Sequence, residues 1–323
     1  LNSVIGATPT PVYAKCEFFG PGGSIKDRIG VAMIEAAEAD GTLKPGGTVV
    51  EATGGNTGLA LAMAASLKGY RCICTMPDKM SEEKIKLLKA FGAEVVITPT
   101  GVAPDDPDHY LVRARSIAES IPDAVMANQF YNQANPKAHY ETTGREIWEQ
   151  SEGRVTHFVA SAGTGGTVTG VGRYLKEKNP SVQIVGVDPE GSILSTFFNT
   201  GEKVEGHPYK VEGIGNDKIP GTLDLDVVDE YMSFDDGVAF RMARRIAREE
   251  GLFVGGSAGL LVHAAVEVAR RVNDPDAFVV TLACDWGERY LSKVYDDDWM
   301  LENGFLEEPG HASGSESIRK CDS

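Results

Sequence analysis

Short runs rich in β-branched residues alternate along the chain with longer amphipathic segments. Strands are predicted at 48–51, 71–76, 93–98, 156–160, 183–187 and 278–283. Helices are predicted at about 57–68, 81–91, 168–178, 235–250 and 257–272. This alternation is typical of α/β proteins, in which helices cover both faces of a mostly parallel twisted sheet, and the two series of elements predict two such sheets.

Size and charge narrow the class of protein. A chain of 323 residues with 42% hydrophobic content can bury a large core, and two domains are the expectation. The net charge is −16, and the acidic residues are spread along the chain, which argues against a nucleic-acid partner. Apolar stretches such as 59–67 and 260–268 are too short to cross a bilayer, so no membrane partner is expected.

The five cysteines are scattered and form no CxxC pair, and the six histidines show no metal spacing. Reduced thiols and the absence of a visible targeting segment favour a cytoplasmic protein without metal. Cys284 fits the role of a small hydrophobic residue at a strand end better than that of a reactive thiol. The segment 306–323 is expected to be a flexible tail.

The first motif with candidate chemistry is GGSIKDR at 22–28, between a predicted strand at 12–18 and a helix. Lys26 would lie in the first turn of that helix. The positive end of the helix dipole disfavours an ammonium there, which suits an amine that acts as a nucleophile or a Schiff-base partner. A lysine on the surface is the alternative interpretation of this motif alone.

Two further glycine-rich turns lead from a strand into a helix. Thr53-Gly54-Gly55-Asn56-Thr57 offers backbone N–H groups and two polar side chains to a substrate carboxylate or a ring hydroxyl, although a turn that only caps the helix is equally compatible. Gly163-Thr164-Gly165-Gly166-Thr167 could surround a single phosphate. It lacks the lysine of a P-loop and the GxGxxG spacing, which favours a phosphomonoester cofactor over a nucleotide.

The fourth motif is GGSAG at 255–259, where Ser257 follows a glycine turn at the start of a long helix. Alone, Ser257 could be an ordinary helix cap. Beside the other three motifs, its hydroxyl becomes a candidate partner for an aromatic ring nitrogen.

In this order, the motifs closely resemble those of the fold-type II pyridoxal phosphate enzymes, specifically the cysteine synthase and cystathionine β-synthase family. The resemblance covers nearly the whole chain. It extends through NQFYNQANPKAHYETT, VGVDPEGS and VEGIG as well as the four segments above. It implies a fold like that of the tryptophan synthase β subunit, with pyridoxal 5'-phosphate as the cofactor.

The resemblance also implies a role for each candidate residue. Lys26 would hold the cofactor covalently and then act as acid and base at the substrate's α-carbon. Asn56 would contact the ring hydroxyl, Ser257 the pyridine nitrogen, and residues 163–167 the phosphate. The substrate would be held by a set from three segments: Thr53, Gly54, Gly55, Asn56, Thr57, Gln129 and Gly213.

The implied domains are a larger cofactor-binding domain, 1–20 with 132–305, and a smaller mobile substrate-binding domain, 21–131. Closure of the smaller domain would keep water from the intermediate. The implied reaction replaces the β-substituent of L-serine or an O-activated serine with a thiol, through an aminoacrylate. Family members are usually homodimers that act on small amino-acid and thiol substrates, and the same is expected here.

The branch within the family is less sharply marked. Glu212 in VEGIG and the ending around Trp299 resemble cystathionine β-synthase. Cysteine synthases usually carry Gln at the position of Glu212. Asn128-Gln129-Phe130 is closer to cysteine synthase, and Asn216 stands where animal and fungal relatives have Tyr. Ala52 and Gly54 replace the usual Pro and Ser. Cystathionine synthesis is therefore the favoured hypothesis, cysteine synthesis from O-acetylserine and sulfide the alternative, and an inactive binding partner the third.

Overall fold

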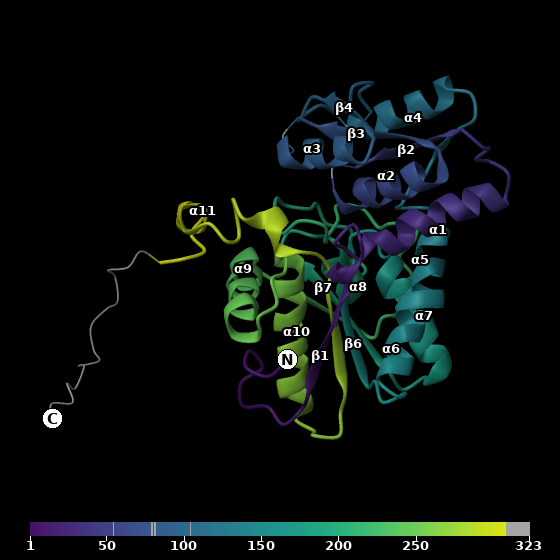
Figure 1. The fold of residues 1–323 in the computed structure, drawn as a ribbon. Coiled ribbons are helices and arrows are strands. Elements are labelled where there is room, and N and C mark those ends of the chain that lie inside the picture. The colour runs from purple at the N-terminus through teal and green to yellow at the C-terminus, as the bar shows by residue number, and fades with distance from the viewer. Residues whose placement is uncertain (54, 79, 81, 104, 308–323) are drawn as a thin grey trace.

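The computed structural model describes residues 1–53, 55–78, 80, 82–103 and 105–307. Two parallel sheets, each flanked by helices, form the molecule (Figure 1). The predicted α/β class and the pair of sheets are both confirmed. Gly54 and nearly all of the expected tail lie outside the described residues.

The larger sheet has five strands in the order β1-β9-β6-β7-β8. Their bounds are β1 Val12–Cys16, β6 His157–Ser161, β7 Gln183–Pro189, β8 Glu230–Phe234 and β9 Val279–Ala283. The first strand lies beside the last, with Val12 opposite Val279 and Cys16 opposite Ala283. Strands β6 and β9 are buried along most of their length, as expected for a sheet that is covered on both faces.

The helices around this sheet come mainly from the second half of the chain. They are α5 Ala134–Ala138, α6 Arg145–Gln150, α7 Gly166–Lys178, α8 Leu194–Thr200, α9 Asp236–Arg245, α10 Gly256–Val272 and α11 Asp297–Glu302, with π-helical turns at His139–Gly144 and Ile246–Glu250. Short 3-10 turns lie at Leu225–Val227 and Gly287–Tyr290. The predicted helix at 235–250 is therefore present over nearly its whole length, as α9 followed by a π-helical turn.

The smaller sheet has the order β4-β3-β2-β5, with β2 Thr48–Ala52, β3 Arg71–Pro77, β4 Glu94–Thr98 and β5 Ala124–Met126. Its helices are α1 Lys26–Ala39, α2 Asn56–Lys68, α3 Glu82–Ala90 and α4 Tyr110–Ser120. Along β2, Val49 packs into the core with α1 and α2, whereas Val50 packs into the core with α4. Because successive strand residues face opposite sides, one short strand supports both cores.

The first predicted strand is shorter than expected. It was predicted at 12–18, but β1 ends at Cys16 and a 3-10 turn follows at Glu17–Phe19. Glu17 is buried there, and its carboxylate accepts hydrogen bonds from Arg28 at 2.6 and 2.9 Å. Arg28 also donates to Glu146 at 2.6 and 2.7 Å, so the turn anchors α1 to α6.

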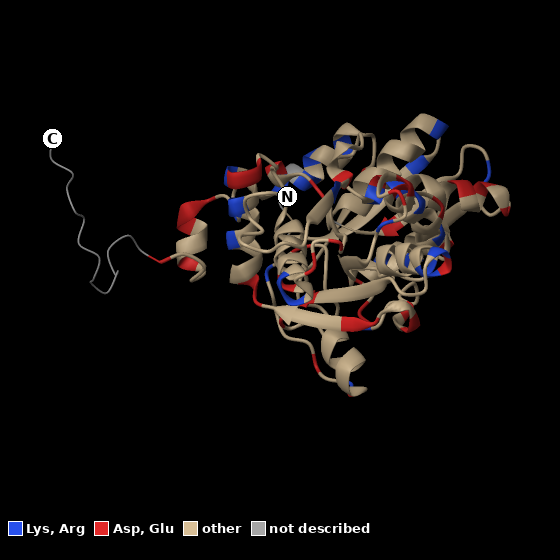
Figure 2. Ribbon diagram, turned by 90° about the horizontal axis from the view of Figure 1, so that it is seen from below, with Lys and Arg blue, Asp and Glu red and all other residues tan. Residues whose placement is uncertain are grey.

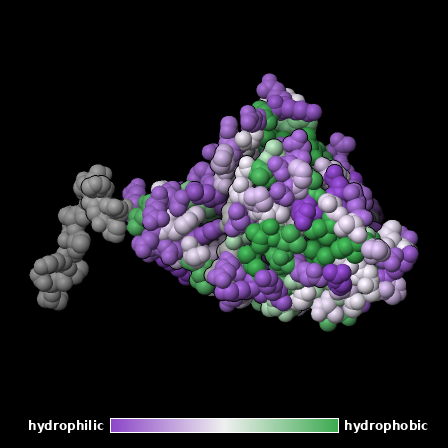
Figure 3. Space-filling model, turned by 90° about the horizontal axis from the view of Figure 1, so that it is seen from above, coloured by the Kyte–Doolittle hydropathy of each residue, from purple (hydrophilic) through white to green (hydrophobic). Residues whose placement is uncertain are grey.

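The surface is mixed in both charge and hydropathy. Basic and acidic residues are interspersed along the ribbon in Figure 2. The face seen from above shows a hydrophobic area bordered by hydrophilic residues (Figure 3). No helix within the described ranges has the length and hydropathy required to cross a membrane.

Candidate active site

Lys26 is the first residue of α1, as predicted. Burial lowers the pKa of Lys26, and the negative charge of Asp285 nearby opposes that shift. The predicted direction is confirmed, but loss of hydration is its leading cause rather than the helix dipole. Among the described residues, Nζ has no hydrogen-bond or ion-pair partner, so the amine is available to a ligand.

The loop that carries Lys26 is held by the segment after β9. Ile25 N–H donates to the carbonyl of Cys284 at 2.9 Å, and Trp286 N–H donates to the carbonyl of Gly23 at 3.2 Å. The Arg289 guanidinium donates to the same Gly23 carbonyl at 2.9 Å. These contacts join residues more than 250 positions apart and link the loop that carries Lys26 to the segment after β9.

The substrate-loop motif lies at the carboxyl end of β2. Asn56 Nδ2 donates to Asp285 Oδ2 at 2.8 Å, and Thr57 Oγ1 donates to Gln129 Oε1 at 2.6 Å. Thr57 and Gln129 were both predicted for the substrate site, and the structure brings them together in a buried pair. Thr53 is also buried, and its hydroxyl accepts from Gly55 N–H at 3.3 Å.

The candidate phosphate loop, 163–167, connects β6 to α7 and is packed tightly from behind. An added Cβ would lie 2.3 Å from the Gly213 carbonyl at Gly163, 2.5 Å from Leu223 at Gly165 and 1.9 Å from Asn135 Oδ1 at Gly166. Gly165 also has a φ of +84°, which favours glycine. The three glycines are therefore required by their neighbours, and Gly213 is placed directly beside the loop.

Ser257 is buried in the first turn of α10 and lies beside the thiol of Cys284. Burial raises the pKa of Cys284 to about 12, so the thiol is protonated at neutral pH. This agrees with the predicted unreactive role. Because Cys284 is also close to Lys26, the fourth motif reaches the same site as the first.

Three helices leave their N-termini open toward ligands at these loops. No side-chain hydrogen bond caps α2, α7 or α10, and none of them has an acidic residue in its first turn. Their first N–H groups and positive dipole ends can therefore receive an anion, and no acidic residue in the first turn of these helices competes with it. Together with the unpaired amine of Lys26, this donor set fits a phosphorylated aldehyde and an amino-acid carboxylate.

Sequence reasoning missed His139, which is buried behind the phosphate loop. Its Nε2 lies 3.2 Å from Thr167 Oγ1, and its Nδ1 lies 2.9 Å from Thr143 Oγ1. Burial lowers the pKa of His139 to about 3, with the charges of Lys26 and Arg28 acting in the same direction. The imidazole is neutral at pH 7 and supports the loop; its only sequence signal was a histidine inside an otherwise helical segment.

Glu51 was missed as well. It is 1% exposed near the end of β2, its carboxyl faces the backbone of Asn128 and Gln129, and its Oε2 has no hydrogen-bond partner among the described residues. Burial raises the pKa of Glu51 to about 8, so the group is mostly protonated at neutral pH. It holds the backbone of the segment that carries Gln129; a carboxyl in a fully buried strand was the available signal.

Asp285 is the third residue missed by the sequence reasoning. It follows β9 and is 2% exposed, and its carboxylate accepts hydrogen bonds from Asn56 and Tyr290. Its position just beyond the carboxyl end of a parallel strand was the available signal, because ligands bind at that edge of such sheets.

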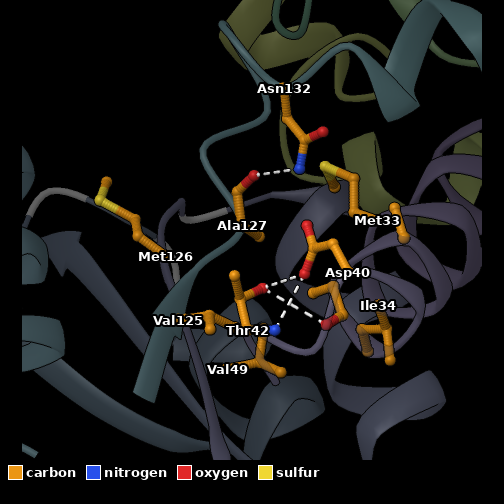
Figure 4. Close-up of a pocket in the computed structure, with 11 residues that line it drawn as sticks. Met33, Ile34, Asp40, Thr42, Val49, Val125, Met126, Ala127 and Asn132 are labelled. Atoms are coloured by element: carbon orange, nitrogen blue, oxygen red, sulfur yellow. Dashed lines mark hydrogen bonds between the residues drawn. The ribbon is translucent and has the colours of Figure 1, made fainter. Parts of the chain in front are cut away.

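A cavity of about 200 Å³ lies elsewhere, between the second half of α1 and β5 (Figure 4). Of the residues that line the cavity, Met33 is nearest to Lys26 in sequence. It lies seven positions farther along α1, which is about 10 Å along the helix axis. The polar groups of the cavity are occupied: Asn132 donates to Ala127 at 2.9 Å, and Thr42 donates to Asp40 at 2.6 Å. The cavity does not belong to the constellation around Lys26.

The described cysteines, Cys16, Cys72, Cys74 and Cys284, are all free. In the same part of the chain, no cluster of three or more histidine, cysteine or acidic side chains could hold a metal ion.

The family model "Pyridoxal-phosphate dependent enzyme" matches residues 1–285, which includes all four motifs. The chain belongs to this family of pyridoxal phosphate enzymes. Its cofactor is therefore pyridoxal phosphate, and the residues around Lys26 fit that group.

The family contains curated relatives with high similarity to this chain. "Cystathionine beta-synthase" of Oryctolagus cuniculus is 51% identical over 297 residues, which is 92% of this chain and 54% of the relative. The protein of the same name from Dictyostelium discoideum is 44% identical over 95% of this chain and 61% of its own length. The one from Saccharomyces cerevisiae is 43% identical, again over 95% of this chain and 62% of its own length. The chain thus spans between half and two thirds of these relatives.

Proposed function

We propose that this protein replaces the hydroxyl group of L-serine with the thiol of homocysteine, which gives cystathionine and water. The cystathionine β-synthase relatives, up to 51% identical, support this hypothesis. Transfer of sulfide to an O-activated serine is the second candidate, and it shares the same mechanism. The observation that best supports cystathionine synthesis is the environment of Glu212.

Glu212 connects the two halves of the molecule through charge pairs. Its carboxylate accepts from Lys84 at 2.5 Å and from Lys293 at 2.6 Å. Lys84 belongs to α3 beside the smaller sheet, whereas Lys293 belongs to the segment before α11. The two lysines lower the pKa of Glu212 against the effect of its burial. A neutral Gln, usual in cysteine synthases, could not form two ion pairs, so this feature favours the cystathionine β-synthase branch.

Lys26 is the proposed acid and base of the reaction. Bound pyridoxal phosphate supplies an electron sink that stabilises negative charge at the substrate's α-carbon. Because burial favours the neutral amine, Lys26 Nζ can accept the α-proton once it is released from the cofactor. The same amine can return a proton to the α-carbon after the thiol has added to the β-carbon.

The remaining residues would bind and orient the cofactor and the substrate. The open end of α7 and residues 163–167 would receive the phosphate, Ser257 the pyridine nitrogen and Asn56 the ring hydroxyl. Since Thr57 donates to the side-chain oxygen Oε1 of Gln129, the side-chain N–H groups of Gln129 stay available for the substrate carboxylate. Thr53, Gly54, Gly55 and Gly213 complete the proposed substrate site.

We further propose that residues 21–131 move as the smaller domain and close over the substrate. The Lys84–Glu212 pair crosses from one sheet's helices to the other sheet's loops, as a contact that forms on closure would. Closure would keep water from the reacting atoms. A homodimer stays the expected assembly.

Steady-state kinetics test the proposed substrates. Serine with homocysteine should give a larger kcat/KM than O-acetylserine with sulfide. A preference of about tenfold for the second pair, equal to about 1.4 kcal/mol in transition-state binding, would exclude the first candidate in favour of the second.

The position of the cofactor has a separate test. Borohydride reduction followed by peptide mapping should place the cofactor on Lys26, and Lys26→Ala should lack the visible absorption band. A colourless wild-type protein that stays colourless with added pyridoxal phosphate would support an inactive binding partner instead.

A further inference from the structure

Asp285 is a buried carboxylate that the proposed reaction does not use. It follows β9 (Val279–Ala283) by two positions and is 2% exposed. Burial raises the pKa of Asp285, whereas the hydrogen bonds from Tyr290 and Asn56 and the charges of Arg289 and Lys26 lower it. Arg289 Nη1 lies 4.0 Å from its Oδ2. Burying a carboxylate is costly unless it is paired and hydrogen-bonded, so its partners indicate what it is for.

The two oxygens of Asp285 have different surroundings. Oδ2 accepts from Tyr290 Oη at 2.6 Å and from Asn56 Nδ2 at 2.8 Å. Oδ1 has no partner within the described part of the chain, although it is buried. It lies against Gly255, where an added Cβ would come within 2.3 Å of it. The carboxylate therefore fits between the starts of α2 and α10, the helices that carry Asn56 and Ser257.

The Asn56 amide is a two-ended group whose orientation decides what it offers to a ligand. With Nδ2 toward Asp285, the carbonyl oxygen and the second N–H remain for another partner. The reversed amide would place its carbonyl oxygen against the carboxylate, and two acceptors would then face each other without a proton. Only one orientation is compatible with an ionised Asp285.

We propose that Asp285 is a positioning residue that sets the orientation of the Asn56 amide, and through it the hydrogen bond to the cofactor's ring hydroxyl. The inference rests on the proposed role of Asn56. It adds a link across the molecule, because Asn56 starts a helix beside the smaller sheet and Asp285 follows a strand of the larger one.

The test measures pyridoxal phosphate binding without amino-acid substrates, so that an error in the proposed substrates cannot affect it. Asp285→Leu removes the acceptor at similar size, whereas Asp285→Asn keeps a carbonyl oxygen that Asn56 can donate to. We expect Asp285→Leu to raise the Kd for pyridoxal phosphate at least tenfold and to shift the visible absorption band. Asp285→Asn should restore most of both. Tyr290→Phe, which removes only the other donor to Oδ2, should leave the band unchanged.

Three results would overturn the proposal: an unchanged Kd and band in Asp285→Leu, equal losses in the Leu and Asn variants, or the same band shift in Tyr290→Phe. If Asp285→Leu does not fold, Asn56→Asp takes its place, because it sets two carboxylates against each other. Its Kd should be raised, and the double variant Asn56→Asp, Asp285→Asn should recover by exchanging donor and acceptor. Equal Kd values for the single and double variants would contradict the inference.

Discussion

The two glycine-rich loops at the candidate site have similar sequences but opposite packing. In the phosphate loop, a Cβ at Gly163, Gly165 or Gly166 would overlap a neighbour by a wide margin. In the substrate loop, a Cβ at Gly55 would have no atom within 4 Å. The first loop is glycine-rich because the protein leaves no space behind it, whereas no protein atom excludes a Cβ at Gly55. This difference suits a rigid site for a resident cofactor and an open site for a substrate that comes and goes.

The largest effect is expected from Gly166→Ala. The new Cβ would lie 1.9 Å from Asn135 Oδ1, and Asn135 is held because its Nδ2 donates to Gln129 and Thr164 at 2.9 Å. The loop must move, so we expect the Kd for pyridoxal phosphate to rise about 100-fold, or about 2.7 kcal/mol. Fluorescence titration of the cofactor-free protein measures it. A change below threefold would mean that this loop is as adaptable as the other.

Thr57→Val should act on the substrate and leave the cofactor alone. It removes the hydroxyl that donates to Gln129 Oε1 at 2.6 Å in a buried pair, at a stability cost of about 1 kcal/mol. With its partner gone, the Gln129 amide can turn its oxygen toward the substrate carboxylate, and the KM for serine should rise about tenfold. Thr57→Ser, which keeps the hydroxyl, is the matched control. An equal rise in the Kd for pyridoxal phosphate would argue against separate roles for the two loops.

Glu51→Gln should change the pH dependence of stability. The pKa of Glu51 is raised to about 8 in the folded protein, above its ordinary value of 4.5. The folded state therefore holds this proton more tightly than the unfolded state, and the free energy of unfolding should fall as pH rises from about 4.5 to about 8. Urea denaturation across this range should show a smaller fall in Glu51→Gln than in the wild type. Parallel profiles would show that Glu51 does not titrate in this way.

The smallest effect is expected from Gly55→Ala. Gly55 has an extended backbone with φ −129°, which alanine can adopt, and the space around it is open. The loss of freedom in the unfolded chain should leave stability unchanged or increase it by up to about 1 kcal/mol. Thermal denaturation and cofactor titration serve as the counterpart to Gly166→Ala. A loss of cofactor affinity similar to that of Gly166→Ala would remove the contrast between the loops.

The sequence predicted most of the long elements, because their hydrophobic period is clear, but it missed the 11-residue helix α4. Helices α2, α7 and α10 begin within two residues of the expected positions. Strands β5 and β8 were not predicted: β5 has only three residues, and β8 carries polar residues at a sheet edge. Short edge elements depend on pairing with neighbours, which local pattern does not contain.

The candidate site divides in the same way. Lys26, Thr57 and Gln129 could be selected because each lies in a motif that can be read along the chain. Asp285 had only the weak signal of its place after a strand, where an aspartate is usually solvated, because its partner Asn56 is 229 positions away. His139 and Glu51 act through burial, and the extent of burial becomes visible only once both sheets are in place.

The pairing of β1 with β9 affects how the protein can fold during its synthesis. Every strand of the smaller sheet lies between residues 48 and 126, so that sheet can assemble while the ribosome is still adding the second half of the chain. The larger sheet must wait for residues 279–283 to emerge before β9 can enter between β1 and β6. Lys26 is synthesised more than 250 residues before the segment that holds its loop. The site of the nascent protein therefore stays unfinished until β9 and the residues that follow it have been translated.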